Sequence, residues 1–309
     1  MIDIVIPFYN NSDDFWRNIL RKYLNEENPN DRQATGDERY RDADCFQYWF
    51  RCVEKNCPWV NKVFLIVACE SQLPKWLDTS NPKLRVVYHE EYIPKELLPT
   101  FNTLTIELFI SRIKDLSNNY VYCNDDYYFL NLTNKEMFFV NDLPVYRSHK
   151  VNIEKFGEDY LNASDGSFYQ MLNNGMDLQL EISGDKAHWY ALDHIPVAHK
   201  KDFELEIINK YYDRFIKANL TSRFRNKSMY GNHVFVCLYR DLKPYYVFDY
   251  INSYYVTMRK DIDFNEHSHC NMVCFNDTEQ LNDDDFIEVK NKMIEFFKEK
   301  FPDKSSFER

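Results

Sequence analysis

Residues 120–126 read Tyr120-Val121-Tyr122-Cys123-Asn124-Asp125-Asp126, a short aromatic and apolar run that ends in two adjacent carboxylates. A buried strand that ends this way brings two negative charges to the edge of a sheet, where they repel each other and lose hydration. A divalent cation that also holds a phosphate is a common source of the compensating positive charge. The stretch therefore predicts a strand followed by a phosphate-handling site, although Asn and Asp also favour plain polar turns.

Strand-like and helix-like segments alternate around this stretch over the first 130 residues. Strands are expected at 2–8, 62–68, 84–88 and 120–123, and helices at 15–24, 44–56 and 102–113. The run at 62–68 is continuously β-type, which is typical of a strand buried on both faces. This order predicts an α/β fold with a mixed, mostly parallel sheet flanked by helices. In such sheets ligands bind beyond the carboxyl ends of the strands.

We expect a single catalytic domain over residues 1–309. Its parts are an α/β half at 1–140, a largely helical insertion at 141–260, and a late strand with a C-terminal helix at 261–309. Within these parts, polar residues 26–37 are expected to form a loop and residues 202–217 one helix. The late strand ends in Asn276-Asp277, so the two strand-ending Asn-Asp pairs could meet if both strands belong to one sheet.

Composition argues against several classes of protein. The net charge of −11 disfavours a general nucleic-acid binder. Only 6 of the 309 residues are glycine, and no glycine-rich phosphate-binding motif is present. No secretory signal and no apolar run long enough for a transmembrane helix is found. The 8 cysteines do not frame short loops, so we interpret them as reduced thiols of a cytoplasmic protein.

Two arginine pairs are candidate anion sites. Guanidinium groups match phosphate oxygens in a bidentate fork, and basic pairs in an acidic protein favour a local anion site. A solvated surface run is the alternative interpretation. The candidate residues are Arg39, Arg41 and Asp42, with Arg51 on the helix that follows, and Arg223 with Arg225.

Asn102 and His194 complete the candidates. Asn102 is the first residue of the helix-like segment 102–113, where an asparagine is a good N-cap. His194, which has His199 nearby, could act as a general base toward a hydroxyl nucleophile. A structural hydrogen-bonding role is the alternative for a histidine in such a position.

Taken together, these segments resemble the Stealth family of sugar-1-phosphate transferases. That family includes bacterial capsular polysaccharide phosphotransferases and the GlcNAc-1-phosphotransferase that tags lysosomal enzymes. Its four regions can be matched in order over nearly the whole chain, at Ile2–Val5 with Asn11–Asp13 and Trp16; at Arg39–Asp42, Pro58-Trp59, Gln72–Leu77, Leu98–Asn102, Glu107, Arg112-Ile113 and Asn124–Asp126; at His194–Pro196 with Arg223 and Arg225; and at Cys274–Asp277 with Phe301–Glu308. Two departures are Ile6–Tyr9, where the family usually has Tyr-Thr-Trp-Val, and Cys45-Phe46, where it usually has Glu-Leu.

The resemblance implies a Rossmann-like (GT-A-like) sheet and a metal-dependent phosphotransferase of capsule or cell-surface polysaccharide synthesis. The donor would be a nucleotide-diphosphosugar, with a UDP-sugar expected, and the acceptor a hydroxyl of a glycan, lipid-linked glycans included. UMP would be released. The expected place is the cytoplasm, with peripheral contact at the inner face of the bacterial membrane.

The resemblance also implies roles for individual residues. Mg²⁺ or Mn²⁺ would be held by Asp125, Asp126, Asn276 and Asp277. Phosphate charge would be stabilised by Arg41, Arg223 and Arg225. His194 would be the base, with Asp3 or Asp13 as alternatives for that role or for nucleotide binding. The other expected substrate-binding residues are Arg39, Asp42, Arg51 and Asn102.

Two other functions remain open from the sequence. A metal-dependent glycosyltransferase would use the same carboxylates, attack the anomeric carbon and release UDP. A non-catalytic glycan-binding protein would use some of the aromatic residues, which make up 17% of the chain, for sugar stacking.

Overall fold

The fold is organised around β1 (Ile2–Pro7), the central strand of a five-stranded sheet. β1 pairs in parallel with β2 (Val63–Val67) and β4 (Asn119–Tyr122), and β3 (Leu84–Tyr88) extends the sheet in parallel beyond β2. β10 (Val197–Lys200) is antiparallel to β4, which gives the order β10-β4-β1-β2-β3. The expected mixed, mostly parallel sheet flanked by helices is confirmed. This computed structural model describes residues 1–29, 32–147, 150–151, 155–163, 166–184, 189–190, 194–248 and 252–309.

A second sheet lies beside the first and has the order β12-β13-β5. β12 (Ser253–Thr257) is parallel to β13 (Met272–Asn276), and β5 (Tyr127–Phe129) is antiparallel to β13. Because β4 ends at Tyr122 and β5 begins at Tyr127, the chain crosses from the first sheet to the second through residues 123–126. The smaller sheets are formed by β6 (Phe139–Val140), β7 (Leu143–Tyr146) and β11 (Tyr246–Val247), and by β8 (Lys150–Val151) with β9 (Trp189–Tyr190).

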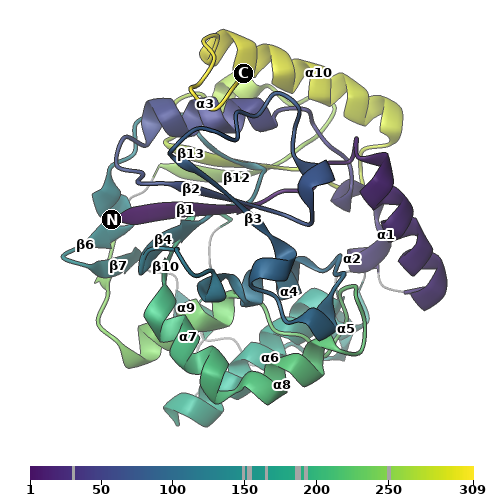
Figure 1. Cartoon of the computed structure of the whole chain (residues 1–309), viewed down its shortest axis with the longest axis vertical. Coiled ribbons are helices and arrows are strands. Elements are labelled where there is room, and N and C mark those ends of the chain that lie inside the picture. The colour runs from purple at the N-terminus through teal and green to yellow at the C-terminus, as the bar shows by residue number, and fades with distance from the viewer. Residues whose placement is uncertain are drawn as a thin grey trace.

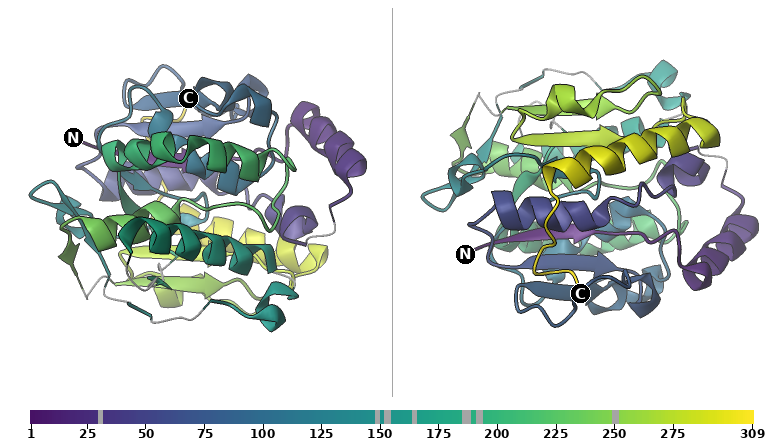
Figure 2. Two further views of the ribbon diagram at one scale, coloured as in Figure 1. Left: turned by 90° about the horizontal axis from the view of Figure 1, so that it is seen from below. Right: turned by 90° about the horizontal axis from the view of Figure 1, so that it is seen from above.

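Helices cover the sheets from two sides (Figure 1). α3 and α10 run along one side, and the rings of Tyr48 and Phe297 stack between them with centroids 5.6 Å apart. Helices α6 to α9 gather on the opposite side, and the two further views in Figure 2 show the same grouping. The helices are α1 (Asp14–Glu27), α2 (Arg32–Thr35), α3 (Phe46–Asn56), α4 (Thr103–Leu108), α5 (Glu158–Leu161), α6 (Gly166–Ser183), α7 (Lys201–Lys210), α8 (Tyr212–Asn219), α9 (His233–Leu242) and α10 (Asp283–Lys300).

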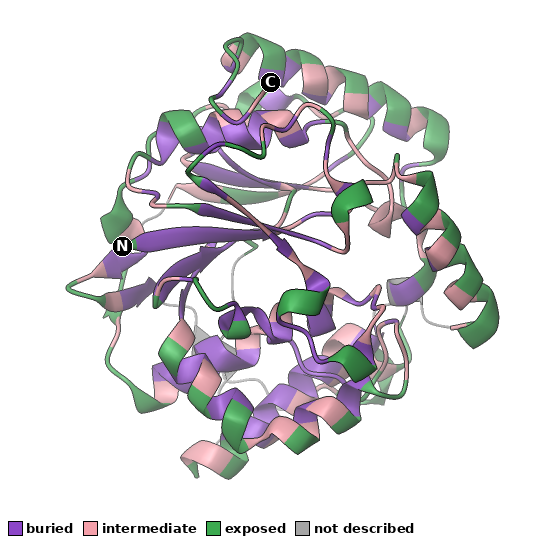
Figure 3. Cartoon of the chain, in the orientation of Figure 1, coloured by how far each residue is buried: buried purple, intermediate pink, exposed green. Residues whose placement is uncertain are grey.

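Burial explains why the central strands form where they do. All five residues of β2 are buried, as expected for a strand covered on both faces, and β1 is buried along most of its length (Figure 3). Two details differ from the sequence-based expectation. The helix expected at 202–217 is two helices, because the backbone leaves the helical conformation at Tyr211. The loop expected at 26–37 contains the end of α1 and the short helix α2.

Residues 141–260 contribute to both sheets as well as forming helices. They contain α5 to α9, but β10 closes one edge of the first sheet and β12 closes one edge of the second. All eight cysteines are free thiols. Within the described ranges, no helix is long and apolar enough to cross a membrane.

The end of the chain is fastened to α3 by Arg51. Its Nε and Nη2 donate to the two carboxylate oxygens of Glu308 at 2.8 and 2.7 Å, and Nη1 donates to the Phe301 carbonyl at 2.9 Å. The guanidinium also lies 4.8 Å from the centre of the Tyr48 ring. The expectation that Arg51 binds substrate is therefore not supported, because its donors are used by the C-terminal segment.

Replacing Arg51 by methionine should lower the free energy of unfolding by roughly 3–5 kcal/mol, because the buried Glu308 carboxylate then loses the guanidinium with which it is paired. The two side chains are only 11% and 5% exposed, so solvent cannot replace the pair. Urea unfolding followed by circular dichroism measures the loss. Glu26→Gln is the matched control, since its pair with Lys22 is exposed and should be worth less than about 1 kcal/mol. Equal losses in the two variants would contradict the assignment.

Candidate active site

A cavity of about 810 Å³ opens where the two sheets meet. β2 and β3 follow β1 in the sequence and lie on one side of it, whereas β4, the next strand, lies on the other side. The strand order therefore reverses between β1 and β4. A crevice at such a switch point is where open α/β sheets bind ligands. The residues that follow the two strands, Phe8 and Tyr9 after β1 and Asn124 after β4, line the cavity.

The two Asn-Asp pairs meet at this cavity. The Phe275 amide donates to the Asp126 carbonyl at 3.0 Å, which places Asp126 beside the end of β13, where Asn276 and Asp277 follow. Their meeting was expected if the strands before them shared one sheet, but those strands, β4 and β13, lie in different sheets. The meeting depends on β5, the strand after Asp126, and not on the strand before it, because β5 is the one that pairs with β13.

The charged forms of Asp125 and Asp126 are disfavoured in the folded protein. Burial raises the pKa of Asp125 to about 8, and the carboxylates of Asp126 and Asp42 add to the rise. Asp125 nevertheless reaches the solvent of the cavity. Burial also raises the pKa of Asp126 to about 6, against the hydrogen bond that its Oδ2 accepts from the Cys274 thiol at 3.2 Å. Both shifts mean that a positive charge at this position would be stabilising.

The donor set suits a cation that is shared with a substrate. In the part of the chain that the structure describes, no three His, Cys, Asp or Glu side chains gather into a metal-binding group. Asp126 Oδ1, however, is buried and has no hydrogen-bond partner among the described residues. Together with Asp125 and the amide oxygen of Asn276, this gives a few hard oxygen ligands. Mg²⁺ is commonly bound in this way, by one or two carboxylates plus substrate phosphates and water.

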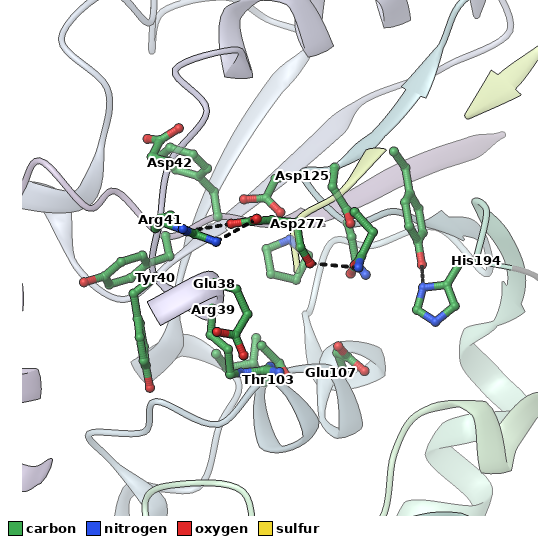
Figure 4. A pocket seen from close by; sticks show the side chains of 18 of the residues that line it. Glu38, Arg39, Tyr40, Arg41, Asp42, Thr103, Glu107, Asp125, His194 and Asp277 are labelled. Carbon is green, nitrogen blue, oxygen red and sulfur yellow. Dashed lines mark hydrogen bonds and ion pairs between the residues drawn. The ribbon is translucent and has the colours of Figure 1, made fainter. Parts of the chain in front are cut away.

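Arg41 lines the cavity, but its guanidinium is bonded to Asp277 (Figure 4). Its Nε and Nη2 each donate to one oxygen of the Asp277 carboxylate at 2.8 Å, and Nη1 and Nη2 donate to the carbonyls of Leu281 and Thr278. The guanidinium lies over the Phe286 ring, 4.4 Å from its centre. Arg41 and Asp277 thus neutralise each other and fix the loop before α10, which does not support their expected roles toward phosphate and metal.

Arg225 and Arg39 form the cationic side of the cavity. Arg225 Nε donates to Thr103 Oγ1 at 3.2 Å. Burial lowers the pKa of Arg225, the nearby Arg39 guanidinium lowers it further, and the Glu107 carboxylate partly offsets both. An arginine in such surroundings stays charged at neutral pH. Two guanidinium groups that repel each other in a partly desolvated cavity favour the binding of an anion between them.

Glu107 and Thr103 are site residues for which the sequence analysis predicted no role. They lie four residues apart, at the start and near the end of α4, and therefore on the same face of it. The Tyr122 hydroxyl lies 2.8 Å from Glu107 Oε1 and 2.6 Å from Asn124 Oδ1, which links the helix to the loop of the acidic pair. The spacing on the expected helix was the signal that could have found them. Asp42 also lines the cavity, and burial raises its pKa.

His194 lines the cavity and lies apart from Arg39, at the edge of the labelled set (Figure 4). Its Nδ1 is 3.3 Å from the hydroxyl of Tyr127, the residue directly after the acidic pair. Its ring centre is 5.0 Å from that of Tyr255 on β12. The imidazole is exposed to solvent, so it can meet a substrate that enters from outside.

Three further candidates have structural partners outside the cavity. Arg223 Nη1 donates to the Pro99 carbonyl at 2.8 Å, and its guanidinium lies 4.8 Å from the Tyr23 ring centre, so it does not support the expected contact with phosphate. Asp13 caps α1 by accepting from the Phe15 amide. Asn102 is fully buried and caps α4 by accepting from the Leu104 amide, as its position at the start of the expected helix predicted.

Asp3 is also a structural residue. It lies in β1 but near the end opposite the cavity, and it is 1% exposed. Its Oδ1 accepts from Asn61 Nδ2 at 2.7 Å and from the Lys62 amide, and its Oδ2 accepts from the Ser117 amide at 2.8 Å. These bonds tie together the segments that lead into β2 and β4. A role for Asp3 as a catalytic base is not supported by this position.

Comparison with known proteins gives relatives over the whole chain. A family model described as Stealth protein CR2, conserved region 2, matches residues 39–146. A capsular polysaccharide phosphotransferase, WcwK, of Streptococcus pneumoniae is 34% identical over 100% of this chain and 98% of its own length. The exopolysaccharide phosphotransferase cps2G of Lactiplantibacillus plantarum is 28% identical over 100% of this chain and 96% of its own length.

Among solved structures, the apo form of the bifunctional glycosyltransferase WbbM covers 98% of this chain and 52% of its own. The sequence identity is 8% and the TM-score is 0.40, which is too low for a conclusion about the fold.

The raised pKa of Asp125 predicts a pH-dependent gain in stability for Asp125→Asn, measured by thermal unfolding in EDTA. Because the folded-state pKa of Asp125 lies above its usual value, at about 8, the folded chain binds a proton that the unfolded chain releases. The contribution of Asp125 to wild-type stability should therefore fall as pH rises from about 4 toward 8. The variant lacks this loss, so its Tm should exceed that of the wild type at pH 8.5 and match it at pH 4.

Asp261→Asn, in the exposed turn between β12 and β13, is the control and should shift Tm by similar small amounts at both pH values. A gain for Asp125→Asn that is equal at pH 4 and pH 8.5 would contradict the assigned burial effect.

Proposed function

The chain belongs to the Stealth family of capsular polysaccharide phosphotransferases, and from this premise we propose that it transfers a sugar 1-phosphate from a nucleotide-diphosphosugar to a hydroxyl of a glycan acceptor. A UDP-sugar is the expected donor. The observation that carries the proposal is that one cavity combines the Asp125-Asp126 pair, the Arg39 and Arg225 guanidinium groups and His194. These are the parts that a phosphoryl transfer needs: positioning, charge stabilisation and a proton acceptor.

The proposed step exchanges one phosphorus–oxygen bond for another. The acceptor oxygen attacks the phosphorus that carries the sugar, and the bond from that phosphorus to the oxygen bridging it to UMP breaks. UMP leaves with that oxygen and the bonding electron pair, and the acceptor proton passes to a base. The product contains a phosphodiester between two sugars, so the glycosidic carbon of the donor keeps its bond to oxygen.

Arg39 and Arg225 are the groups proposed to bind the transferring phosphoryl oxygens. They face the cavity, whereas the other members of the two arginine pairs hold Asp277 and the Pro99 carbonyl. Because their mutual repulsion is already present without substrate, an arriving anion relieves it. Charge developing on the equatorial oxygens would then be stabilised without reorganisation of the site.

The acidic pair is proposed to bind Mg²⁺ or Mn²⁺, with Asp125, Asp126 and the Asn276 amide oxygen as its protein ligands. Such an ion would neutralise charge on the diphosphate and on the departing UMP. Asp277 is left out of this set because both of its carboxylate oxygens accept from Arg41.

His194 is proposed as the base. If its Nδ1–H donates to the Tyr127 oxygen, Nε2 keeps the lone pair that accepts the proton of the attacking hydroxyl. Tyr127 follows Asp126 directly, so this hydrogen bond keeps the imidazole near the acidic pair. His194 lies on the solvent side of the cavity, where an acceptor can reach it.

Incubation of the protein with UDP-sugars, a glycan acceptor and Mn²⁺ should release UMP, and chromatography of the nucleotides measures it. EDTA should stop the release, and added Mg²⁺ or Mn²⁺ should restore it. His194→Gln should be slower by roughly 10²–10⁴-fold, the usual contribution of a general base. UDP as the released nucleotide would sink the proposal in favour of a glycosyltransferase.

Arg225 and Arg223 form a matched pair of variants. Arg225→Lys should reduce kcat by about 10²-fold, because the lysine keeps the charge but loses the guanidinium fork at the developing charge. Arg223→Lys should change kcat by only a few-fold and lower Tm instead, since its bond to the Pro99 carbonyl is structural. Initial rates of UMP release and thermal melts of both variants measure the difference. Equal losses of kcat would argue against the assignment.

A further inference from the structure

Two neighbouring tyrosines on the edge strand β12 differ in what they face. Tyr254 and Tyr255 are 48% and 49% exposed, so neither is a core residue. Successive side chains of a strand point to opposite faces of the sheet. Tyr254 lies near the rings of His267 and His269, with centroids 5.9 and 6.2 Å away. Tyr255 lines the cavity beside His194.

The register of the second sheet explains why Tyr255 reaches the active site. Tyr255 is aligned with Cys274 of β13, and Cys274 is aligned with Tyr127 of β5. Side chains aligned across neighbouring strands share a face, so these three form one row. The Cys274 thiol in the middle of the row donates to Asp126, and His194 contacts both tyrosines, with ring centroids 5.0 Å from Tyr255 and 6.3 Å from Tyr127.

Tyr127 and Tyr255, the tyrosines in contact with His194 among the described residues, differ in exposure. Tyr127 is buried, with 6% exposed, and its hydroxyl is the partner of His194 Nδ1. Tyr255 exposes about half of its surface on the cavity side of an edge strand. An exposed aromatic ring has an apolar face that packs against the C–H face of a sugar ring, while polar groups around it bind the hydroxyls.

We propose that Tyr255 is the platform on which a pyranose ring of the acceptor glycan stacks, so that its attacking hydroxyl meets His194. The inference rests on the proposed function and adds the place of the acceptor to it. The acceptor and not the donor is assigned to Tyr255, because Arg39, one of the two groups proposed to bind phosphate, lies apart from His194 (Figure 4). The base must be within hydrogen-bond distance of the acceptor hydroxyl, and Tyr255 is in ring contact with that base.

Initial rates with UDP-sugar and short oligosaccharides cleaved from the host's capsular polysaccharide test this assignment. Tyr255→Ala should raise the KM for the oligosaccharide by roughly 3–10-fold, the value of one aromatic packing contact. The KM for the donor should not change. Tyr255→Phe keeps the ring and should remain near the wild-type value. Tyr254→Ala is the matched control, with equal exposure on the other face of the same strand, and should change neither constant.

A second readout separates this inference from the proposed chemistry. Saturation-transfer NMR of the same oligosaccharides, recorded without nucleotide, reports binding alone. The signal should fall for Tyr255→Ala and persist for Tyr255→Phe and Tyr254→Ala. If Tyr255→Ala and the wild type have the same acceptor KM and the same NMR signal, the proposal that Tyr255 binds the acceptor is wrong. Release of UDP by the wild type would refute the proposed phosphotransfer. The NMR comparison of acceptor binding would still test the role of Tyr255.

Discussion

The antiparallel pairing of β5 with β13 is the constraint on which the active site depends. These strands are separated by more than 140 residues, and their alignment places Tyr127 opposite Cys274. Because β4 and β5 belong to different sheets, both ends of the loop at residues 123–126 are fixed by strand pairing. The Asp125-Asp126 pair is held against the end of β13, and the row that includes Tyr255 is brought under His194. A one-residue slip would turn this row to the other face of the sheet.

The cavity that results is electrostatically unfavourable when it is empty. The acidic pair has raised pKa values on one side and Arg225 has a lowered one on the other, with burial as the first cause in each case. Elsewhere in the same region the chain does pair its charges, as in Arg41 with Asp277 and His199 with Glu204. The two carboxylates with raised pKa values and Arg225 thus line the one cavity that we propose to bind a metal–diphosphate. This is the expected pattern for a site organised in advance for its transition state.

The sequence could predict the strands, because continuous apolar runs such as Val63–Val67 reflect burial directly. It also suggested that the two Asn-Asp pairs could meet within one sheet, but they meet because β5, the strand after Asp126, pairs with β13 of a second sheet. It could not separate Arg225 from Arg223, which are two residues apart in an irregular loop where no periodicity fixes the direction of a side chain. Asp3 was misplaced for a related reason: the residue lies on the correct strand but at its other end. Glu107 was matched to the family pattern but was given no role, because a glutamate on an expected helix usually faces solvent. Its role becomes apparent only when the structure places Arg225 near it.

The C-terminal segment has a consequence for the order of events in the cell. β13 supplies Asn276 and the partner of β5, α10 packs on α3, and Glu308 is bound by Arg51. One wall of the cavity is therefore missing until residues 272–308 have left the ribosome. β4 ends at Tyr122, so β1 to β4 can be assembled long before β13 has been made. A translation product that stops before residue 272 would carry the Asp125-Asp126 pair without the strand that holds this pair in place.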